Sequence, residues 1–486
     1  MDNAPPLLIT SIESLTKAKI LCIGDVMLDK FVYGDVERIS PEAPIPVFNI
    51  KADKLMLGGA GNVACNLAGL GAKTQFIAVI GNDLAGKDVK NLVATIPNTK
   101  STLIIEKQRH TSVKTRFVAG VQQMMRTDDE TVSPITKDTK QKIIKHVKSI
   151  INNCTTLILS DYAKGVLTPE MTKELIRLAK KAGIPIVVDP QGNSYEQYKG
   201  ASIVTPNRKE LSLATSMPTN NDDQIIAAAR KIISKNKIGS VLATRSSDGM
   251  TLIDHKRSDT FKAEAREVFD VSGAGDTVVA TIGASLSAGI DLSQAVRLAN
   301  ISAGVVVAKA GTAVAYATDI IELLEERELN NKDIKILNTK SVLNRAKFWR
   351  SQNLKVGFTN GCFDLLHPGH IATINTAKAA CDKLIVGLNN DASIRRLKGE
   401  HRPIQPEKVR AQILTALKNV DAVIVFSDNT PIKIIEALKP DVFIKGADYK
   451  INKIPEARIV KAYGGKILLA KLADGHSTTA TIAKLK

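Results

Sequence analysis

The stretch that decides the fold is Asp270-Val271-Ser272-Gly273-Ala274-Gly275-Asp276-Thr277. Small and apolar residues follow it to Ala288 and predict a buried helix. Glycines at a helix start leave backbone N–H groups accessible, and these donors together with the helix dipole can bind a phosphate oxygen. Asp276, in the first turn, would lie beside that phosphate and could accept a proton from an attacking hydroxyl. The alternative is a glycine turn in which Asp276 only caps the helix.

This octapeptide resembles the second signature of the ribokinase-like (PfkB) carbohydrate kinases. The resemblance implies that Asp276 is the catalytic base and that the amides of Gly273, Ala274 and Gly275 form the anion hole. Earlier in the chain, Leu57-Gly58-Gly59-Ala60-Gly61-Asn62 opens a predicted helix and resembles the first signature of the same family. Gly58 and Gly59 would let a sugar approach the backbone, and Asn62 could bind its hydroxyls. The presence of both signatures, in the family's order, supports the resemblance more strongly than either signature alone.

Short apolar runs alternate with helical patterns through much of the chain. The runs 19–23, 157–160, 186–188 and 241–244 each end at a polar cluster. This alternation predicts a mostly parallel, doubly wound α/β sheet. Ligands bind such sheets beyond the carboxyl ends of the strands, so we expect the polar clusters to assemble there.

Candidate sugar ligands follow the first of these strands. Asp25 and Asp29 come just after residues 19–23 and could bind sugar hydroxyls, although one of them could merely cap a turn. Residues 31–50 alternate in polarity but contain three prolines, which a central strand would not tolerate. With the alternating run 112–126, they predict a small β-lid outside the main sheet.

The ribokinase-like family uses such a lid to cover the sugar and often to form a dimer, so the resemblance implies a homodimer. Three basic residues of the lid, Lys114, Arg116 and Arg126, could meet a substrate phosphate. They could equally lie on solvated strand faces.

Two further segments resemble the family's nucleotide-binding elements. Asn207-Arg208-Lys209-Glu210 resembles the Asn-x-x-Glu motif, which implies a place near the ATP phosphates, with Glu210 acting on Mg²⁺ through water. The turn from Thr244 through Ser246 to Gly249 resembles the nucleotide-binding strand-turn. Lys164 and Asp189 are weaker candidates, and a monovalent cation such as K⁺ near Asp270 is a further implication of the resemblance.

A second unit is expected after the kinase-like part. The acidic helical pattern at 320–331 gives way to a polar segment of mixed charge without sheet patterning. We therefore expect a first domain over residues 1–330, a linker over 331–350 and a second domain over 351–486.

The second domain opens with an apolar run, 354–358, that leads into Thr359-Asn360-Gly361-Cys362-Phe363-Asp364-Leu365-Leu366-His367-Pro368-Gly369-His370. Two histidines three positions apart at a helix N-terminus can reach one triphosphate. Their imidazoles would stabilise charge on the α-phosphate and on the leaving pyrophosphate. A zinc site is the competing interpretation, but the H-E-x-x-H pattern is absent and no third ligand is nearby in the sequence.

That stretch resembles the cytidylyltransferase-like nucleotidyltransferases, whose His-x-Gly-His motif it contains. The resemblance implies a Rossmann-like domain in which His367 and His370 are catalytic. A basic loop around 398–402, a strand end near residue 445 and hydroxyls before the last helix complete the expected nucleotide site. The expected nucleotide-binding residues are Asn360, Gly361, Cys362, Phe363, Gly369, Lys398, Arg402, Lys445, Ser477, Thr478 and Thr479.

Composition limits the remaining function classes. The chain has 486 residues and a formal net charge of +18, but its lysines are spread evenly and only 4% of its residues are aromatic. Stacking platforms for nucleic-acid bases are therefore not expected, and binding sites for anionic substrates explain the charge better. The five cysteines are widely spaced, and neither a signal peptide nor a long apolar segment is visible. We expect a cytoplasmic enzyme with no nucleic-acid or membrane partner.

Taken together, the sequence predicts a bifunctional enzyme that uses ATP and Mg²⁺ and acts on sugar phosphates. The first site would phosphorylate a sugar, and the second would transfer a nucleotidyl group. One alternative is a different pairing of sugar kinase and nucleotidyltransferase, with another sugar or with CTP. The alternative from another class is a basic nucleic-acid-binding protein built on degenerate enzyme folds.

Overall fold

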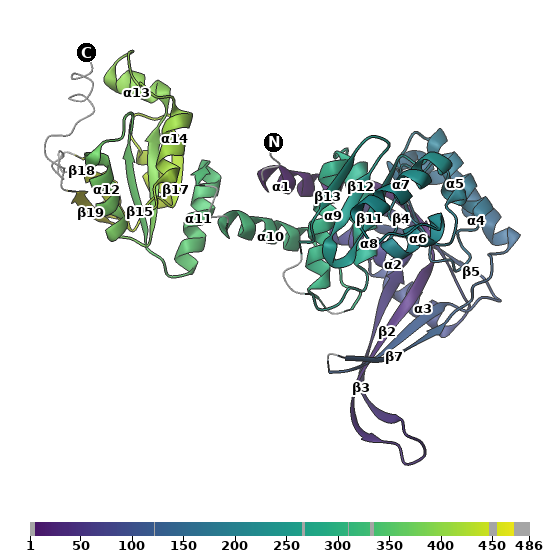
Figure 1. Cartoon of the computed structure of the whole chain (residues 1–486). Helices are drawn as coiled ribbons and strands as arrows, with labels where there is room; N and C mark the ends of the chain where they lie inside the picture. Colours follow the sequence, from purple (N-terminus) through teal and green to yellow (C-terminus); the bar gives the residue numbers. More distant parts are fainter. Residues whose placement is uncertain are drawn as a thin grey trace. The chain divides into compact units, whose positions relative to one another are not determined.

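The computed structural model describes residues 5–120, 122–264, 268–309, 311–330, 335–446 and 454–470. The chain divides into two compact units, Met1–Leu324 and Glu325–Lys486 (Figure 1). Each unit is an α/β structure with a parallel sheet and is described by itself.

A nine-stranded sheet forms the centre of the described part of the first unit, in the order β13-β12-β11-β10-β9-β8-β1-β4-β5. Its strands are parallel except for β12 and β13, which pair antiparallel at one edge. The strands are β1 Lys19–Gly24, β4 Lys73–Ile80, β5 Thr99–Ile105, β8 Thr156–Ser160, β9 Ile186–Asp189, β10 Ile203–Val204, β11 Ser240–Thr244, β12 Met250–Ile253 and β13 Ser258–Phe261.

Helices cover both faces of this sheet, because its central strands are apolar on both sides. In β1, Ile20 and Cys22 face one core while Leu21 and Ile23 face the other. The first core includes residues of α1 Pro5–Ser14, α2 Ala60–Gly69, α3 Leu84–Ala94, α8 Ala274–Ser287, α9 Leu292–Val307 and α10 Ala317–Asn330. The second includes residues of α4 Lys137–Ile150, α5 Pro169–Lys181, α6 Arg208–Thr215 and α7 Asp222–Asn236.

Helix α8 is buried from Asp276 to Ser285. Small residues make this possible, since a Cβ atom added at Gly283 would lie 2.4 Å from the Cδ1 atom of Ile158 in β8. The helix that carries the predicted base is therefore also a central element of the core.

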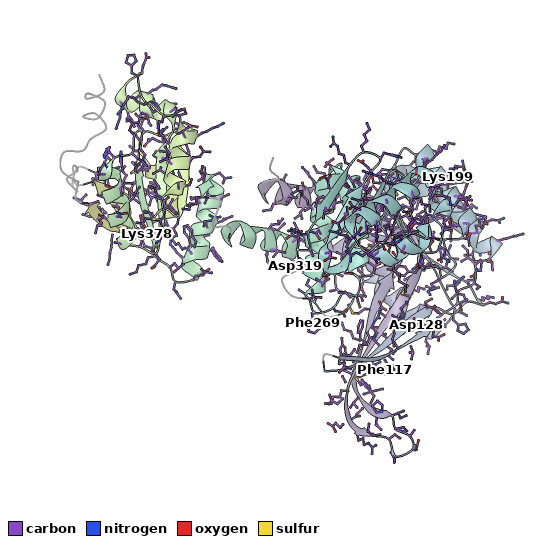
Figure 2. The ribbon with its side chains drawn as sticks, in the orientation of Figure 1. Phe117, Asp128, Lys199, Phe269, Asp319 and Lys378 are labelled. Atoms are coloured by element: carbon purple, nitrogen blue, oxygen red, sulfur yellow. The ribbon has the colours of Figure 1, made fainter. Side chains whose placement is uncertain are left out.

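A separate four-stranded sheet, in the order β3-β2-β6-β7, forms the predicted lid. Its strands are β2 Val26–Ile39, β3 Pro46–Gly59, β6 Ser112–Ala119 and β7 Gln122–Asp129. Pro41 and Pro44 lie in the turn between β2 and β3, where no ladder hydrogen bond is lost. Figure 1 shows these strands extending away from the helices of the unit, and Figure 2 places Asp128 nearer to those helices than Phe117.

The described part of the second unit contains a six-stranded parallel sheet in the order β14-β17-β16-β15-β18-β19. The strands are β14 Ile336–Leu337, β15 Val356–Gly361, β16 Lys383–Asn389, β17 Ala422–Phe426, β18 Val442–Gly446 and β19 Lys466–Ala470. The helices are α11 Thr339–Ser351, α12 Pro368–Ala379, α13 Asp391–Lys398, α14 Glu407–Ala416, α15 Ile432–Leu438 and α16 Ala457–Ala462.

The segment expected to be a linker differs in the structure. Within residues 335–350, β14 pairs with β17, and α11 places Val342, Ala346 and Trp349 in the core of the second unit. These apolar positions are four and three residues apart, so they share one helix face. The polar residues between them lowered the overall apolarity and obscured that face in the sequence.

In the first unit, β4 and β5 lie on one side of β1, and the strands from β8 onward lie on its other side. In the second unit, β16 and β17 lie on one side of β15, and β18 and β19 lie on the other. The direction in which strands are added therefore reverses between β1 and β8 and between β15 and β18. Ligands of such sheets bind in the crevice at the reversal, beyond the carboxyl ends of the strands. Asp25 follows β1, and the segment of His367 and His370 follows β15. Among the described residues, no helix is both long enough and apolar enough to cross a membrane.

Candidate active sites

The N-terminus of α8 is open to a ligand. Gly273 is its N-cap residue and has φ +79°, a left-handed conformation that favours glycine. Gly273 has no side chain, so no side-chain hydrogen bond caps the first turn. A Cβ atom added at Gly275 would have no neighbour within 4 Å, which means that open space lies over this turn. Gly273 and Gly275 can therefore present donors to an anion, whereas the Ala274 N–H donates to the Val271 carbonyl oxygen at 3.3 Å and would have to exchange that long bond for the anion.

Asp276 lies at the edge of that space, and its side chain is held from two sides. It is 4% exposed, and its two carboxylate oxygens accept hydrogen bonds from Asn62 Nδ2 at 2.8 Å and from the Tyr162 hydroxyl at 2.7 Å. Burial raises the pKa of Asp276 to about 7, and the charge of Asp29 adds to the rise while the two hydrogen bonds oppose it. A carboxyl group with this pKa can both take up and release a proton near neutral pH.

Asn62 is fixed in turn by a short polar chain. Asn66 donates to Asn62 Oδ1 at 3.1 Å, and Thr277 donates to Asn66 Oδ1 at 3.0 Å. The sequence predicts that Asn62 binds the sugar, but in this structure its amide nitrogen is hydrogen-bonded to Asp276. Its second N–H remains for a substrate hydroxyl.

Asp25 holds the loop that follows β8. Its carboxylate accepts backbone N–H groups from Tyr162 at 2.9 Å, Lys164 at 3.0 Å and Val166 at 3.1 Å. Burial raises its pKa, while these hydrogen bonds lower it. Gly59, with φ +58°, lies so close that a Cβ atom there would approach the Asp25 carbonyl oxygen to 2.5 Å. Asp25, which is 1% exposed, therefore positions Tyr162.

The other predicted sugar ligands lie at the base of the lid. Asp29 accepts from Arg116 Nη1 at 2.5 Å, and the Arg116 guanidinium lies 5.1 Å from the centre of the Phe31 ring. Gly58 leaves room for Asp29, because a Cβ atom there would lie 2.4 Å from Asp29 Oδ2. Lys114 lies 3.9 Å from Asp128, a loose ion pair that leaves it able to meet a phosphate.

Arg126 also pairs with Asp128, at 2.9 Å. The lid cations are therefore paired with carboxylates rather than directed only at solvent.

The Asn-x-x-Glu motif forms the start of α6. The Asn207 side chain accepts from the Glu210 N–H at 3.0 Å, and Glu210 Oε2 accepts from the Asn207 N–H at 2.8 Å. This capping box occupies one oxygen of Glu210 and leaves the other for a ligand or a water. Arg208 pairs with Asp248 at 2.5 Å, whereas Lys209 is exposed.

The neighbouring turn after β11 lies against this motif. Thr244 forms an isolated parallel bridge with Asn207, so the two predicted nucleotide segments are side by side. Ser246 is exposed, and Gly249 has φ +86° and lies against the backbone of Phe261. Arg245, which is 5% exposed, ties the turn to Asp222.

Several carboxyl groups at this crevice repel one another. Burial raises the pKa of Asp189, and the charges of Asp276, Glu210 and Asp161 raise it further. Burial also raises the pKa of Glu210. A cation bound among these carboxyl groups would relieve their mutual repulsion. In the described ranges no three His, Cys, Asp or Glu side chains are arranged to hold a metal ion directly.

In the second unit, His367 is the N-cap residue of α12 and His370 lies in its first turn. Their rings are stacked with centres 3.9 Å apart, and the Phe363 ring lies 5.0 Å from His370. An open depression of about 580 Å³ borders His367, Pro368 and Asn375. Gly369, between the two histidines in the sequence, is buried.

His370 is neutral at physiological pH in this structure. Partial burial and the charges of His367 and Lys398 together lower its pKa to about 4, while a backbone hydrogen bond with Leu365 opposes them. A neutral imidazole has one N–H, so donation to a phosphate oxygen would replace its hydrogen bond with Leu365. The exposed Lys398 is near enough to act on His370 and on Cys362, whose thiol pKa is raised by burial.

Two buried ionic contacts hold the His-x-Gly-His loop. Asp364, 2% exposed, pairs with Arg402 at 2.9 Å and accepts the N–H groups of Ile404 and Gln405. Arg410, 1% exposed, donates to the carbonyl oxygen of Cys362 at 2.6 Å and pairs with Asp391 at 2.5 Å. Arg402, predicted to hold a phosphate, is thus paired with Asp364.

Lys445 crosses the reversal point of the second sheet. Its ammonium group donates to Asn360 Oδ1 at 2.9 Å and lies 3.6 Å from Glu456. The carboxyl ends of β15 and β18 are thereby joined beside Gly361. The predicted residues Ser477, Thr478 and Thr479 lie outside the described residues.

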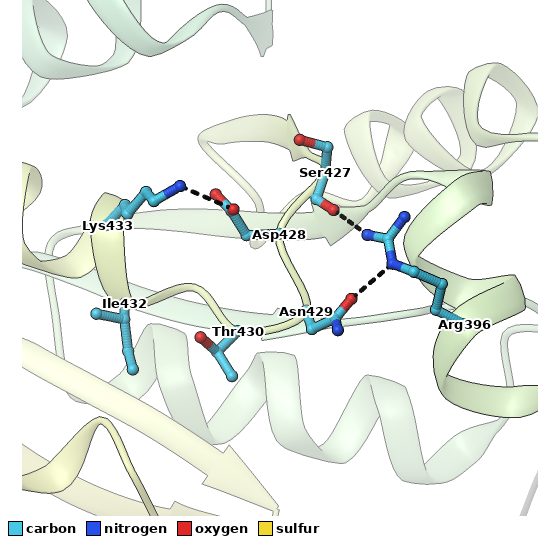
Figure 3. Close-up of a pocket in the computed structure, with 7 residues that line it drawn as sticks. All are labelled: Arg396, Ser427, Asp428, Asn429, Thr430, Ile432 and Lys433. Atoms are coloured by element: carbon cyan, nitrogen blue, oxygen red, sulfur yellow. Dashed lines mark hydrogen bonds and ion pairs between the residues drawn. The ribbon is translucent and has the colours of Figure 1, made fainter.

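A second cavity lies at the end of β17, with a volume of about 340 Å³ (Figure 3). Arg396 binds the Ser427 carbonyl oxygen at 2.5 Å and Asn429 at 2.9 Å, and Lys433 pairs with Asp428 at 3.0 Å. Its cationic groups are thus engaged with protein atoms, and it lies two strands from β15.

Sequence reasoning did not identify three positioning residues. Tyr162 donates to Asp276, and Asp364 and Arg410 hold the histidine loop. The only signal for Tyr162 was its place in a polar cluster after a buried strand. For Arg410, the signal was a lone cation in an otherwise apolar helix.

Known proteins resemble the chain over both units. The family model described as pfkB family carbohydrate kinase matches residues 17–319, and the model described as cytidylyltransferase-like matches residues 358–482. The proteins named Bifunctional protein HldE from Rhodospirillum rubrum and Paramagnetospirillum magneticum are 48% and 49% identical to it. These matches cover 100% and 98% of this chain and 98% of each relative.

Solved structures share the fold of the first unit. Ribokinase from Arabidopsis thaliana, complexed with ribose and ATP, has a TM-score of 0.51 at 21% identity and covers 63% of this chain and 98% of its own. Phosphofructokinase-2 from Escherichia coli, in complex with potassium, has a TM-score of 0.55 at 21% identity and covers 64% and 98%. From these matches, the chain belongs to the pfkB family of carbohydrate kinases and, over its full length, to the bifunctional HldE proteins, which join that kinase to a cytidylyltransferase-like domain.

Proposed function

We propose that this protein is a bifunctional enzyme of ADP-heptose biosynthesis for the lipopolysaccharide core. Its first unit phosphorylates D-glycero-β-D-manno-heptose 7-phosphate at C1 with ATP. After a separate phosphatase removes the 7-phosphate, its second unit transfers AMP from ATP to the heptose 1-phosphate and releases pyrophosphate. The observation that carries the two chemistries is the pair of sites: Asp276 beside an open helix N-terminus, and the stacked pair His367 and His370 beside another. The identity of the sugar follows from the resemblance to the HldE proteins.

In the kinase reaction, Asp276 accepts the proton of the C1 hydroxyl while that oxygen attacks the γ-phosphorus of ATP. The P–O bond to ADP breaks, and ADP leaves with the electron pair. The amides of Gly273 to Gly275 stabilise the charge on the transferring group. Asn62 and Tyr162 keep the carboxylate oriented toward the hydroxyl. Asp25, Asp29 and Lys114 would hold the sugar phosphate under the lid.

Bound Mg²⁺ would neutralise charge on the ATP phosphates and would be held through water by Glu210. Potassium is a candidate activator, because phosphofructokinase-2 from Escherichia coli was solved in complex with it. Asp270 is the residue we assign to it. In this structure Asp270 accepts the N–H groups of Ser272 and Gly311 and so shapes the loop before α8.

In the adenylyl transfer no base is needed, because the sugar phosphate is already an anion. Its oxygen attacks the α-phosphorus of ATP, and the bond to pyrophosphate breaks. His367 and His370 donate N–H groups to the phosphate oxygens, and Lys398 and Lys445 contribute positive charge. Positioning and charge stabilisation supply the catalysis.

The test is mass spectrometry of products formed from heptose, ribose and fructose phosphates with ATP or CTP. We expect a heptose bisphosphate and ADP-heptose with ATP. Turnover restricted to another sugar, or to CTP, would support the alternative pairing of kinase and transferase. Steeply salt-dependent DNA binding without turnover would instead favour the nucleic-acid-binding alternative.

We also propose that the protein acts in the cytoplasm as a homodimer formed through the lid. The lid exposes large apolar side chains, with Ile39 and Ile50 each 61% exposed and Met125 53% exposed. Exposed apolar surface of this kind favours association. Analytical ultracentrifugation of the wild type and of Ile50→Lys would test this, since a wild type that is monomeric at micromolar concentration would contradict it.

A further inference from the structure

The two ends of the β6–β7 hairpin meet at one buried guanidinium. Arg109 precedes β6 and is 7% exposed. It donates to the carbonyl oxygens of Ser133 at 2.6 Å and Thr131 at 3.4 Å, which both follow β7. It also donates to the carbonyl oxygen of Lys164 at 2.8 Å, in the loop after β8. A single side chain therefore joins both ends of the hairpin to that loop.

The charge of Arg109 is compensated by Glu106, whose Oε2 lies 2.9 Å from Arg109 Nε. Glu106 is itself fixed, because its Oε1 accepts from the Thr136 N–H at 2.8 Å and from the Thr139 hydroxyl at 2.9 Å. Thr136 and Thr139 belong to the start of α4. The guanidinium is thus held between the start of α4, the ends of the hairpin and the loop after β8, so its place depends on all three.

A second link runs between the same two segments. Glu130, directly after β7, accepts from Lys164 Nζ at 2.6 Å, and both side chains are mostly buried, at 22% and 16% exposure. The Ile135 N–H donates to the Gly165 carbonyl oxygen at 3.0 Å. The end of the lid hairpin and the loop after β8 are therefore connected by an ion pair, a backbone hydrogen bond and Arg109.

The loop after β8 in turn reaches the base. The backbone N–H groups of Tyr162 and Lys164 both donate to Asp25 Oδ2, and the Tyr162 hydroxyl donates to Asp276. A shift of Lys164 would therefore be transmitted to Tyr162 through two residues of backbone and a shared carboxylate.

We propose that Arg109 and the Glu130–Lys164 ion pair are positioning residues that couple the lid to the catalytic base of the kinase. When the lid closes over a sugar, the ends of β6 and β7 set the place of the loop after β8, and the Tyr162 hydroxyl is held on Asp276. When the lid is displaced, that hydroxyl leaves its position. The base is thus fully oriented only with substrate under the lid, which limits transfer of the γ-phosphate to water. This inference rests on the proposed kinase activity.

The test begins with Glu130→Gln, which keeps the shape of the side chain and removes the ion pair. Coupling energies between linked residues correspond to changes in rate from roughly 2-fold to more than 100-fold, and for a partly exposed ion pair we take the lower part of that range, roughly 3- to 10-fold. We expect kcat of the kinase to fall by about that factor while KM for ATP stays unchanged. Glu174→Gln is the matched control, since Glu174 forms an ion pair with Arg177 at 2.7 Å on the exposed face of α5. The adenylyl transfer of the same samples reports the amount of intact chain, and the melting temperature of the first unit checks that this unit is folded.

A double-mutant cycle then asks whether the effect passes through Tyr162. In a Tyr162→Phe background, Glu130→Gln should lower kcat by less than twofold further, because the hydroxyl it positions is already gone. Fully additive losses would overturn the coupling. Arg109→Lys, which cannot span the three carbonyl oxygens, should reproduce the loss of kcat if it folds; an unchanged kcat in that variant also contradicts the proposal.

Hydrogen exchange gives a readout that needs no activity. In Glu130→Gln, the amides of Tyr162, Lys164 and Val166 should exchange at least threefold faster than in the wild type, while Glu174→Gln leaves them unchanged. If those amides keep their protection in Glu130→Gln, the coupling is wrong, whatever the enzyme phosphorylates. If exchange changes as expected but no sugar phosphate is phosphorylated by the wild type, the proposed kinase function fails and the coupling stands.

Discussion

Asp276 in the first unit and His370 in the second are both ionisable side chains in the first turn of a helix, and partial or full burial favours the neutral form of each. For Asp276 this raises the pKa to about 7, and for His370 it lowers the pKa to about 4. The neutral carboxyl group cannot accept a proton, whereas the neutral imidazole can still donate a hydrogen bond. At neutral pH, burial therefore reduces the fraction of Asp276 that can accept a proton, whereas it leaves His370 in a form that can donate a hydrogen bond.

The difference follows from the substrates. The kinase must remove a proton from a hydroxyl, so its base needs a pKa close to the working pH. The transferase receives an anionic phosphate and needs only donors. Burial of Asp276 raises its pKa and so gives the base a sufficient affinity for the proton. The two hydrogen bonds to its carboxylate keep the pKa from rising further.

The largest effect is expected from removing each catalytic group. Asp276→Asn should lower kinase turnover by about 10²- to 10⁴-fold and leave adenylyl transfer unchanged. His370→Ala should lower adenylyl transfer and leave the kinase unchanged. Separate coupled assays for ADP and for pyrophosphate measure the two activities. If either substitution abolished both activities in a folded protein, the two sites would not be independent.

A smaller loss is expected from closing the anion site. Gly275→Ala adds a methyl group where no atom lies within 4 Å, so the fold should accept it. The methyl group would occupy space needed by the phosphate, and we expect kcat/KM of the kinase to fall by about 10²-fold. The melting temperature should be unchanged or slightly higher, because alanine favours helix more than glycine does. Full activity in this variant would place the phosphate elsewhere.

The two pH profiles should separate below neutrality. Because Asp276 is protonated below its pKa of about 7, kinase kcat/KM should fall tenfold for each pH unit below that value. The neutral form of His370 persists down to about pH 4, so protonation of this residue should not reduce adenylyl transfer between pH 5 and 8. Substrate phosphates titrate near pH 6 in both reactions, so the informative quantity is the ratio of the two rates. A constant ratio from pH 5 to 8 would contradict the comparison.

The smallest effect concerns the hydrogen bond from Tyr162. Tyr162→Phe removes a donor that lowers the pKa of Asp276, so the acid limb of the kinase profile should move up by about 1 unit. At pH 7 this means a several-fold loss of kcat. Tyr198→Phe is the control, because the Tyr198 hydroxyl donates to Asp161 and not to Asp276. Equal shifts in both variants would show that the effect is general rather than local.

Much of the fold could be predicted because apolar runs ending in polar clusters have one common explanation, a parallel sheet with ligands at its carboxyl edge. In the structure Asp25 follows β1, Asp276 is reached by Tyr162 from the loop after β8, and the segment of His370 follows β15. The segment that begins at residue 339 was harder to assign to a domain, because α11 buries only three or four side chains among many polar ones.

The partners of the catalytic groups could not be predicted, because they come from distant segments. Tyr162 and Asp276 are separated by 114 residues, and Arg410 and Cys362 by 48. No local pattern distinguishes a tyrosine that orients a base from one that packs in a core. The same limit applies to Arg402, whose basic character suggested phosphate binding although its nearest partner is Asp364.

Helix α8 has a consequence for changing the substrate. The residues after Asp276 are packed against β8 so closely that any side chain at Gly283 would force Ile158 to move. The reactive carboxylate therefore cannot be moved to suit a different acceptor without rebuilding the interior. Adaptation to new sugars, in evolution or in the laboratory, is confined to the strands of the lid, where side chains can vary at small cost to folding.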